Sequence, residues 1–321
     1  MRVHPSRPTR SARLAAAVLA LTPLLACSPS ASAQVSTGPT ALAPAVPASS
    51  AGETTSRSGR ADRQFAFLEK SFDARLGVYA LDTGTHRTVG YRAGERFAFA
   101  STAKVLSAAN VLKQSSDADL DRVILYTEND LVSYSPITEK HVATGMSLRE
   151  ICDAALRYSD NTAANLLFAE LGGPKKLDAA LERIGDRTTH VDRVEPELNT
   201  AVPGDVRDTS TPRVLAADLN QYALGPVLNR TDRGLLTGWM RSNTTGDALI
   251  RAGVPAGWTV ADKTGSAAYG TRNDIAVLWP PNGAAPIVLA VLSTRDTQDA
   301  AYDNALIARA TTVTLAALVK S

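Results

Sequence analysis

The sequence predicts an α/β (α+β) fold: an antiparallel sheet built from both ends of the chain, flanked by the terminal helices, with an inserted all-helical lobe. Three observations predict it. Strand-like segments lie near both ends of the body, helical periodicity fills the stretch between them, and 321 residues, 44% of them hydrophobic, suffice for one large domain. A site in the cleft between the lobes is the default expectation.

The first predicted elements are a helix and a hairpin. Phenylalanine and leucine recur at the spacing of one helix face over residues 65–72. Two short apolar segments follow, at 76–81 and 87–91, and the turn-forming sequence Asp-Thr-Gly lies between them at 82–84. This pattern is typical of two antiparallel strands joined by a turn.

Three strands and a helix are predicted at the other end. Apolar segments at residues 258–263, 274–279 and 287–292 have the length and composition of buried strands, and Pro-Pro-Asn-Gly forms a turn after the second. The apolar stretch from about 302 to 319 then predicts a final helix.

The middle of the chain is predominantly helical. From about residue 97 to 241, Ala-rich and Leu-rich segments with helical periodicity alternate with loops. We therefore expect an α/β lobe from residues 61–96 and 242–321, and a helical lobe from 97–241, which together form one catalytic domain.

The start of the chain resembles an export signal. Four arginines precede an apolar run of 13 residues, 14–26, and Ala-Ser-Ala precedes Gln34 as a small-residue cleavage site. The run is shorter than the roughly 20 residues of a membrane-spanning helix. The sequence therefore predicts a signal peptide over residues 1–33 and a secreted protein.

A second interpretation of this segment stays open. Leu-Leu-Ala before Cys27 resembles a bacterial lipobox, in which Cys27 would carry a lipid and anchor the protein at the outer face of the cell membrane. Residues 34–60 are rich in Ala, Ser, Thr, Pro and Gly without apolar periodicity. They are predicted to form a disordered tether.

Charge and composition exclude several functions. Four of the 34 Lys and Arg residues lie in the first 33 residues, which hold no acid, so the body is nearly neutral and we expect no nucleic-acid partner. Beyond the leader, His86, His141 and His190 lack zinc-binding spacing, and we expect no metal and no cofactor. Cys152 fits an apolar helix pattern and predicts a buried thiol without a disulfide.

Ser101-Thr-Ala-Lys104 is the first sequence with a chemical interpretation. It opens an apolar helix, so the spacing of three residues places the hydroxyl and the amine on one face. The helix dipole stabilises negative charge at an attacked carbonyl oxygen, and the dipole with partial burial lowers the pKa of Lys104. A neutral amine can then take the proton of a nucleophilic Ser101.

Two further motifs follow in order. They are Ser159-Asp160-Asn161 and Lys263-Thr264-Gly265. Each alone would be a helix cap or a strand-end turn, but the ordered triplet is similar to the motif set of class A serine β-lactamases and penicillin-binding proteins. Over residues 60–321 the chain resembles a class A serine β-lactamase.

The segment Glu195-Pro-Glu-Leu-Asn199 carries the resemblance further. In the family, the first glutamate and the final asparagine of such a segment hold the water that hydrolyses the acyl-enzyme, which implies this role for Glu195 and Asn199. Arg193 and Asp208 match the ion pair that closes the family's omega-shaped loop. Glu195-Pro196 is expected to be a cis bond.

The resemblance also implies roles for single residues of the pocket. Tyr134 matches an aromatic wall, Asn161 the amide that binds the substrate's acylamide group, and Ser159 the hydroxyl that passes a proton to the leaving ring nitrogen. The positions that bind the substrate carboxylate correspond to Lys263, Thr264, Ser266 and Arg272, and Gly265 matches a further substrate-binding position.

Two departures from relatives limit the expected activity. Cys152 matches a position that many relatives pair with a second cysteine, which is Ala108 here, so that disulfide is absent. Ala100 and Ala267 stand where some carbapenem-hydrolysing relatives carry a disulfide. The sequence therefore gives no support for specialised carbapenem hydrolysis.

The resemblance implies a monomeric hydrolase that opens the β-lactam ring of penicillins and cephalosporins through an acyl-Ser101 intermediate and confers antibiotic resistance. Two alternatives stay open: a D-alanyl-D-alanine peptidase or penicillin-binding protein of similar fold, and a penicillin-sensor domain that is acylated without turnover. Whether Lys104 or Glu195 is the acylation base also stays open.

Overall fold

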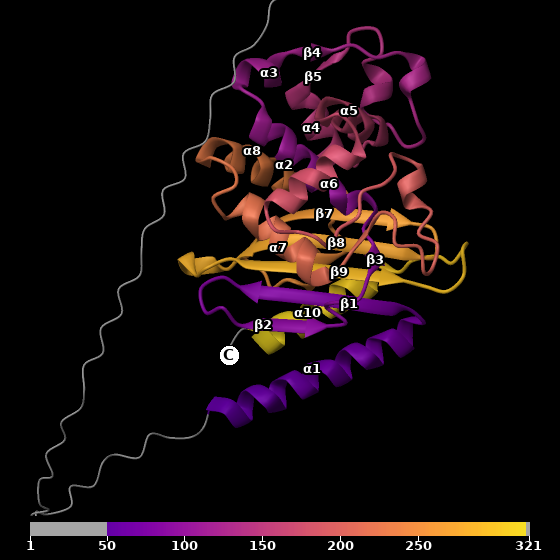
Figure 1. Cartoon of the computed structure of the whole chain (residues 1–321). Helices are drawn as coiled ribbons and strands as arrows, with labels where there is room; N and C mark the ends of the chain where they lie inside the picture. Colours follow the sequence, from indigo (N-terminus) through magenta and orange to yellow (C-terminus); the bar gives the residue numbers. More distant parts are fainter. Residues whose placement is uncertain (1–49, 319–321) are drawn as a thin grey trace, which may run out of the picture. The chain divides into compact units, whose positions relative to one another are not determined.

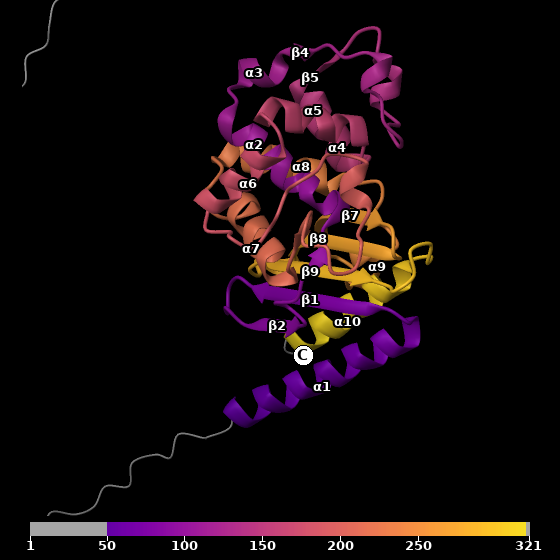
Figure 2. The same cartoon turned by 45° about the vertical axis from the view of Figure 1, so that its right-hand side comes forward.

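A five-stranded antiparallel sheet separates two groups of helices in the computed structural model, which describes residues 50–318. The strand order is β2-β1-β9-β8-β7. α1 and α10 lie on one side of the sheet, and the helices of the middle of the chain lie on the other (Figure 1; Figure 2). The predicted fold class is confirmed.

Both ends of the described chain supply strands to this sheet. β1 is paired with β9, and Val78 lies opposite Val291, so an early strand and the last strand are neighbours. The bounds of the five strands are β1 Arg75–Asp82, β2 Thr88–Tyr91, β7 Thr259–Ala267, β8 Thr271–Trp279 and β9 Ile287–Thr294.

The inner strands β8 and β9 carry apolar residues on both faces because both faces are covered. In β8, Ile275 and Val277 pack with the helices of the middle of the chain, whereas Ala276 and Leu278 pack with α1 and α10. Side chains alternate between the faces of a strand, so consecutive apolar residues serve two cores. At about 1.5 to 3 kcal/mol for each large buried side chain, these cores dominate stability.

The helix before the sheet is longer than predicted. α1 spans Ser50–Phe72, so residues 50–60 of the predicted tether are helical, and no proline after Pro47 interrupts this stretch. The predicted signal peptide, 1–33, and residues 34–49 of the predicted tether lie outside the described residues. α10, Asn304–Leu318, matches the predicted final helix to within two residues at its start.

The helical lobe is formed by residues between β2 and β7. Its main helices are α2 Lys104–Gln114, α3 Asp117–Asp121, α4 Leu148–Arg157, α5 Asn161–Leu171, α6 Pro174–Arg183, α7 Pro212–Ala223 and α8 Arg230–Arg241. The short helix α9, Ile250–Gly253, leads back to the sheet, and two minor pairs join β3 Phe97–Ala98 to β6 Thr209–Ser210 and β4 Val123–Ile124 to β5 Met146–Ser147. The β3–β6 pair places the entry to α2 beside the end of the 193–208 segment.

Candidate active site

Ser101 lies in a 3₁₀ turn, Ala100–Ala103, that leads directly into α2. Ala100 has φ of 50°, a left-handed conformation that costs a non-glycine residue about 1 kcal/mol or more. Ser101 borders a cavity, whereas Lys104, the first residue of α2, is only 3% exposed. The turn therefore presents a hydroxyl to the cavity and holds an amine behind it.

Three oxygens lie within 3.0 Å of the Lys104 amine. Nζ lies 3.0 Å from Glu195 Oε1, and it donates to Asn161 Oδ1 at 2.6 Å and to the Ser159 carbonyl oxygen at 2.8 Å. Among the described residues, the contacts of Nζ do not include Ser101 Oγ. Burial lowers the pKa of Lys104, although the Glu195 carboxylate opposes this effect.

The turn at 159–161 is held by its central carboxylate. Asp160 is fully buried, accepts from Thr138 Oγ1 at 2.9 Å, and caps α5 by accepting from Ala163 N at 2.8 Å. Asp160 is therefore both a helix cap and the centre of the motif, because its hydrogen bonds fix the positions of Ser159 and Asn161. Ser159 has φ of 59°, a strained conformation that the surrounding hydrogen bonds maintain.

Asn161 connects this turn to the loop of Tyr134. Its backbone N donates to the Tyr134 carbonyl at 3.0 Å, and its side chain donates to the Ser133 carbonyl at 2.8 Å. The Tyr134 ring is 61% exposed and borders the cavity. An exposed aromatic ring fixed through its backbone is suited to contact a ligand at the cavity rim.

Lys263 reaches the same turn from β7. Its Nζ donates to Ser159 Oγ at 3.0 Å and to the Thr264 carbonyl at 2.9 Å. Burial and the neighbouring Lys104 charge lower the pKa of Lys263 to about 7. Because Lys104 Nζ lies 3.5 Å from the same hydroxyl, Ser159 stands between two amines that can supply or take a proton.

Gly265 permits β7 to approach the nucleophile closely. A Cβ at this position would lie 3.1 Å from the Phe99 carbonyl oxygen and 3.2 Å from Ser101 N. A larger residue would therefore require the strand or the 3₁₀ turn to shift by a few tenths of an ångström.

The far wall of the cavity carries positive charge. Ser266 in β7 lies opposite Arg272 in β8, and both border the cavity together with Thr264. Arg272 Nε donates to Asn304 Oδ1 at 2.8 Å, and the guanidinium lies 4.6 Å from the ring centre of Tyr302. A guanidinium fixed in this way, beside two hydroxyls, is suited to bind a carboxylate.

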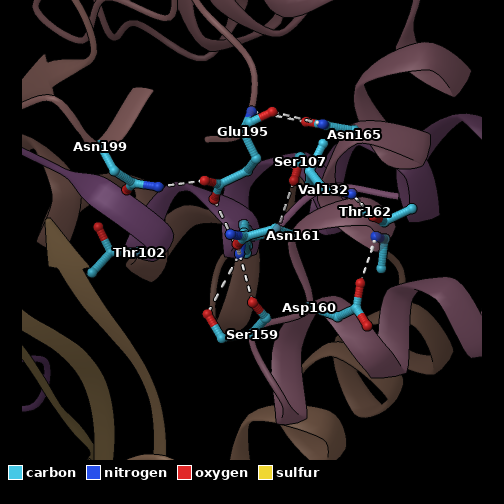
Figure 3. A network of polar contacts seen from close by, with 12 residues as sticks. Thr102, Ser107, Val132, Ser159, Asp160, Asn161, Thr162, Asn165, Glu195 and Asn199 are labelled. Atoms are coloured by element: carbon cyan, nitrogen blue, oxygen red, sulfur yellow. Dashed lines mark hydrogen bonds and ion pairs between the residues drawn. The ribbon is translucent and has the colours of Figure 1, made fainter. Parts of the chain in front are cut away.

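Asn199 and Asn165 hold Glu195 by hydrogen bonds to its side chain and its backbone (Figure 3). Asn199 Nδ2 donates to Glu195 Oε2, while Asn165 in α5 donates to the Glu195 carbonyl at 2.8 Å and accepts from Glu195 N at 2.8 Å. The Glu195-Pro196 bond is cis, as expected. Asn199 Oδ1 is buried and has no hydrogen-bond partner among residues 50–318, so this amide offers an acceptor beside the carboxylate.

The segment that carries Glu195 is closed at its base by the predicted ion pair. Arg193 Nε lies 2.5 Å from Asp208 Oδ2, and Asp208 Oδ1 accepts from the backbone N of Asp192 and of Arg193 at 2.9 and 3.0 Å. Arg193 also donates to Thr200 Oγ1 at 2.7 Å. One buried carboxylate therefore ties the two ends of the segment.

The structure brings the predicted site residues together around one cavity of ≈ 360 Å³. Lys104, Glu195 and Lys263 are buried around its base, and Arg193 and Asp208 support the adjacent segment. Cys152 is buried and free, as predicted. The predicted residues that border the cavity are Ser101, Tyr134, Ser159, Asn161, Asn199, Thr264, Gly265, Ser266 and Arg272.

Four site residues were not predicted. Tyr302 and Asn304 hold Arg272, Asn165 grips Glu195, and Thr245 shares a hydrogen bond of 2.6 Å with Thr264 Oγ1. They belong to none of the three motifs, and their positions along the chain carry no spacing signal that distinguishes them from surface polar residues.

Comparisons with known proteins agree with this geometry. The sequence model of the "Beta-lactamase enzyme family" matches residues 60–318. A β-lactamase of Bacillus amyloliquefaciens is 61% identical over 254 residues, 79% of this chain and 83% of that protein, and one of Amycolatopsis lactamdurans is 59% identical, over 80% and 85%. The crystal structure of a class A β-lactamase from Clostridium kluyveri superimposes with a TM-score of 0.79 at 50% identity, covering 80% of this chain and 97% of that one.

Proposed function

The chain belongs to the class A serine β-lactamase family, and from this premise we propose the role of each site residue and the substrates of the reaction. The protein is a serine β-lactamase, a hydrolase of the kind that confers antibiotic resistance. The contact between buried Lys104 and Glu195, beside Ser101 and Asn199, carries the assignment of roles.

Acylation begins at Ser101. Its Oγ attacks the ring carbonyl carbon, and its proton passes to the neutral amine of Lys104 or to the Glu195 carboxylate. As the C–N bond of the ring breaks, Ser159 gives its proton to the ring nitrogen and regains one from Lys104 or Lys263, whose amines lie 3.5 and 3.0 Å from its Oγ. The product of this half-reaction is an ester on Ser101.

Deacylation uses the pair formed by Glu195 and Asn199. A water bound between the Glu195 carboxylate and Asn199 Oδ1 would attack the ester carbon while Glu195 takes its proton. The C–O bond to Ser101 then breaks and the serine regains a proton. Both side chains are fixed before substrate arrives, because Asn165 and Asn199 hold Glu195.

We propose penicillins and cephalosporins as the substrates. Both classes carry a carboxylate next to the ring nitrogen and an acylamide group on the ring. Arg272, Thr264 and Ser266 would bind the carboxylate, and the Asn161 amide would bind the acylamide. The D-alanyl-D-alanine peptidase and sensor alternatives are not favoured, since the relatives are β-lactamases and the Glu195–Asn199 pair offers a base for hydrolysis of the penicilloyl ester.

Intact mass measurement during turnover of benzylpenicillin tests this function. A transient adduct of one penicilloyl group, with hydrolysed product accumulating, is the expected result, and Ser101→Ala should show neither adduct nor product. A lasting adduct in the parent protein would favour the peptidase or the sensor. Hydrolysis by Ser101→Ala within tenfold of the parent would contradict the assignment of the nucleophile.

We also propose that the protein is exported and acts as a monomer. The support for export is the pattern of residues 1–33, which lie outside the described residues. Within residues 50–318, no helix combines the length and apolar character that crossing a membrane requires. N-terminal sequencing of the protein from culture medium should give Gln34, whereas a lipidated Cys27 in the membrane fraction would support the anchored alternative. Light scattering after gel filtration tests the monomer.

A further inference from the structure

Two aspartates outside the cavity face each other inside the helical lobe. Asp186 follows α6, and Asp218 lies in α7; they are 5% and 4% exposed. The two carboxyl groups lie within hydrogen-bonding reach of each other, and Oδ2 of each carboxyl has no donor among the described residues. Two ionised carboxylates that meet in a buried site repel strongly, so the contact requires a proton on one of them.

The electrostatics of the surroundings favour the same state. Burial and the Asp186 charge raise the pKa of Asp218 to about 9. The other titratable groups near the pair are Tyr222 in α7 and Arg183 in α6. Burial raises the pKa of Tyr222 to about 12, so it stays neutral where Asp218 titrates, and α2 contributes the uncharged Asn110.

The pair lies at the base of the segment that carries Glu195. Asp186 Oδ1 accepts from Thr188 N at 2.7 Å and from Thr189 N at 3.0 Å. Thr189 Oγ1 in turn shares a hydrogen bond of 2.7 Å with Ser210 Oγ, and His190 N donates to the Thr209 carbonyl at 3.0 Å. These contacts join residues 188–190, which precede Arg193, to residues 209–210, which follow Asp208. Through Asp186, the Asp218 side chain therefore holds both ends of the segment against α7.

We propose that Asp186 and Asp218 are positioning residues for deacylation, which share one proton and thereby hold the base of the Glu195 segment against α7. Loss of that proton at alkaline pH leaves two facing carboxylates, and their repulsion displaces the base of the segment, with Glu195 and Asn199, from the ester. The proposal rests on the assignment of Glu195 as the deacylation base.

The variant Asp218→Asn tests the proposal, because its amide donates to Asp186 at every pH. The fraction of acyl-enzyme during benzylpenicillin turnover is measured by rapid quenching and intact mass between pH 7 and 10.5. In the parent, deacylation should slow by about tenfold per pH unit above 9, and in Asp218→Asn this additional slowing should be absent. Lys104 and Lys263 titrate equally in both proteins, so their effect cancels in the comparison.

Asp178→Asn is the matched control. Asp178 accepts from Val191 N at 3.2 Å in the same region but is paired with Lys175, whose Nζ lies 3.5 Å from its Oδ2, and the amide of the variant can still accept the bond from Val191. This variant should keep the alkaline slowing of the parent. Equal slowing in the parent and in folded Asp218→Asn would overturn the positioning role.

Thermal melting separates this proposal from the role of Glu195. The folded state holds a proton on Asp218 that the unfolded chain, with a pKa near 3.8, has lost, so the stability of the parent should fall as pH rises from about 4 to 9. The difference in melting temperature between Asp218→Asn and the parent should therefore increase in favour of the variant across this range. A constant difference would overturn the shared proton, whereas fast turnover by Glu195→Gln would overturn only the role of Glu195.

Discussion

Lys263 Nζ donates to Ser159 Oγ at 3.0 Å, which joins the strand β7 to the turn before α5 across the cavity. The contact links two of the three motifs that the sequence shows far apart. It also places a buried amine at the point where a proton must reach the leaving nitrogen. We therefore expect Lys263 to take part in this proton transfer and, when charged, to favour the binding of an anionic substrate in the adjacent cavity.

The pKa of Lys263 predicts a pH dependence of substrate binding. With a pKa of about 7 instead of 10.5, the amine of the free enzyme loses its charge as pH rises above 7. The anionic substrate favours the charged amine, so binding must take up a proton, and KM for benzylpenicillin should rise by up to about tenfold per pH unit above 7. Steady-state kinetics from pH 6 to 9.5 measure this rise.

Lys263→Arg is the matching control for this prediction. A guanidinium stays charged throughout the range, so the rise of KM should be absent in this variant even where its overall activity is lower. A parent KM that is constant from pH 6 to 9.5 would show that Lys263 keeps its proton.

The contact between Arg272 and Asn304 predicts a graded loss of carboxylate binding. Arg272→Ala removes a charge-assisted hydrogen bond worth about 1.5 to 3 kcal/mol, so KM should rise by roughly 10- to 100-fold with a smaller change in kcat. Asn304→Ala leaves the guanidinium but frees its Nε, and the rise should be only a few-fold. Tyr302→Phe keeps the ring 4.6 Å from Arg272 and should change little. Equal KM values in Arg272→Ala and the parent would remove Arg272 from the site.

The sequence predicted those parts of the fold that depend on local periodicity. The inner strands are predictable because both faces of the sheet are covered and apolar runs such as 287–292 are therefore long, whereas the partly exposed edge strand β2 follows from the turn at 82–84. The start of α1 at Ser50 was missed, since its first turns have the composition of a linker. No local signal distinguishes a linker from a polar helix of this kind.

The site was predictable where it depends on motifs and unpredictable where it depends on tertiary contacts. Ser101, Ser159 and Lys263 belong to short motifs with a fixed chemistry. Asn165 is a polar residue in an apolar helix, and only the folded chain shows that it meets the backbone of Glu195. The Asp186–Asp218 pair likewise needs the packing of α7 on the loop after α6.

Asn165 is predicted to contribute to both stability and deacylation. Asn165→Ala removes the donor and the acceptor that bind the Glu195 backbone, and leaving these groups unpaired should lower the free energy of unfolding by about 1 to 3 kcal/mol. The Glu195 side chain would then be held only by Asn199 and Lys104. We therefore expect kcat to fall more than the rate constant of acylation. Urea unfolding and the acylated fraction at steady state measure the two effects.

Asn165→Asp provides the graded comparison. It keeps an acceptor for Glu195 N but loses the donor to the Glu195 carbonyl, and its charge would face that carbonyl oxygen. We expect a destabilisation of the same sign in both variants. Unfolding free energies equal to that of the parent in both would show that the Asn165 contacts contribute nothing.

The contact of 3.0 Å between Lys104 and Glu195 carries the last prediction. Glu195→Ala removes the proposed base of ester hydrolysis, while Ser101 keeps Lys104 as a base for acylation. Without the carboxylate, the main effect that opposes burial disappears and only the weaker effect of the Asp160 charge still raises the Lys104 pKa, so the neutral form of the amine is favoured further. Ser101 should therefore still attack the substrate, and the ester should persist.

General-base catalysis contributes about 10²- to 10⁴-fold, or roughly 3 to 5 kcal/mol at 1.4 kcal/mol per tenfold, so deacylation by Glu195→Ala should slow by this factor. Intact mass should show a stable penicilloyl adduct, and product release should stop after a burst of about one equivalent. Glu195→Gln is the control of similar shape, because its amide keeps a contact with Asn199 but cannot accept the proton of water. Continued fast turnover by both variants would assign the water to another group. An absence of adduct would make Glu195 necessary for acylation as well, which would identify it, instead of Lys104, as the base for the attack of Ser101.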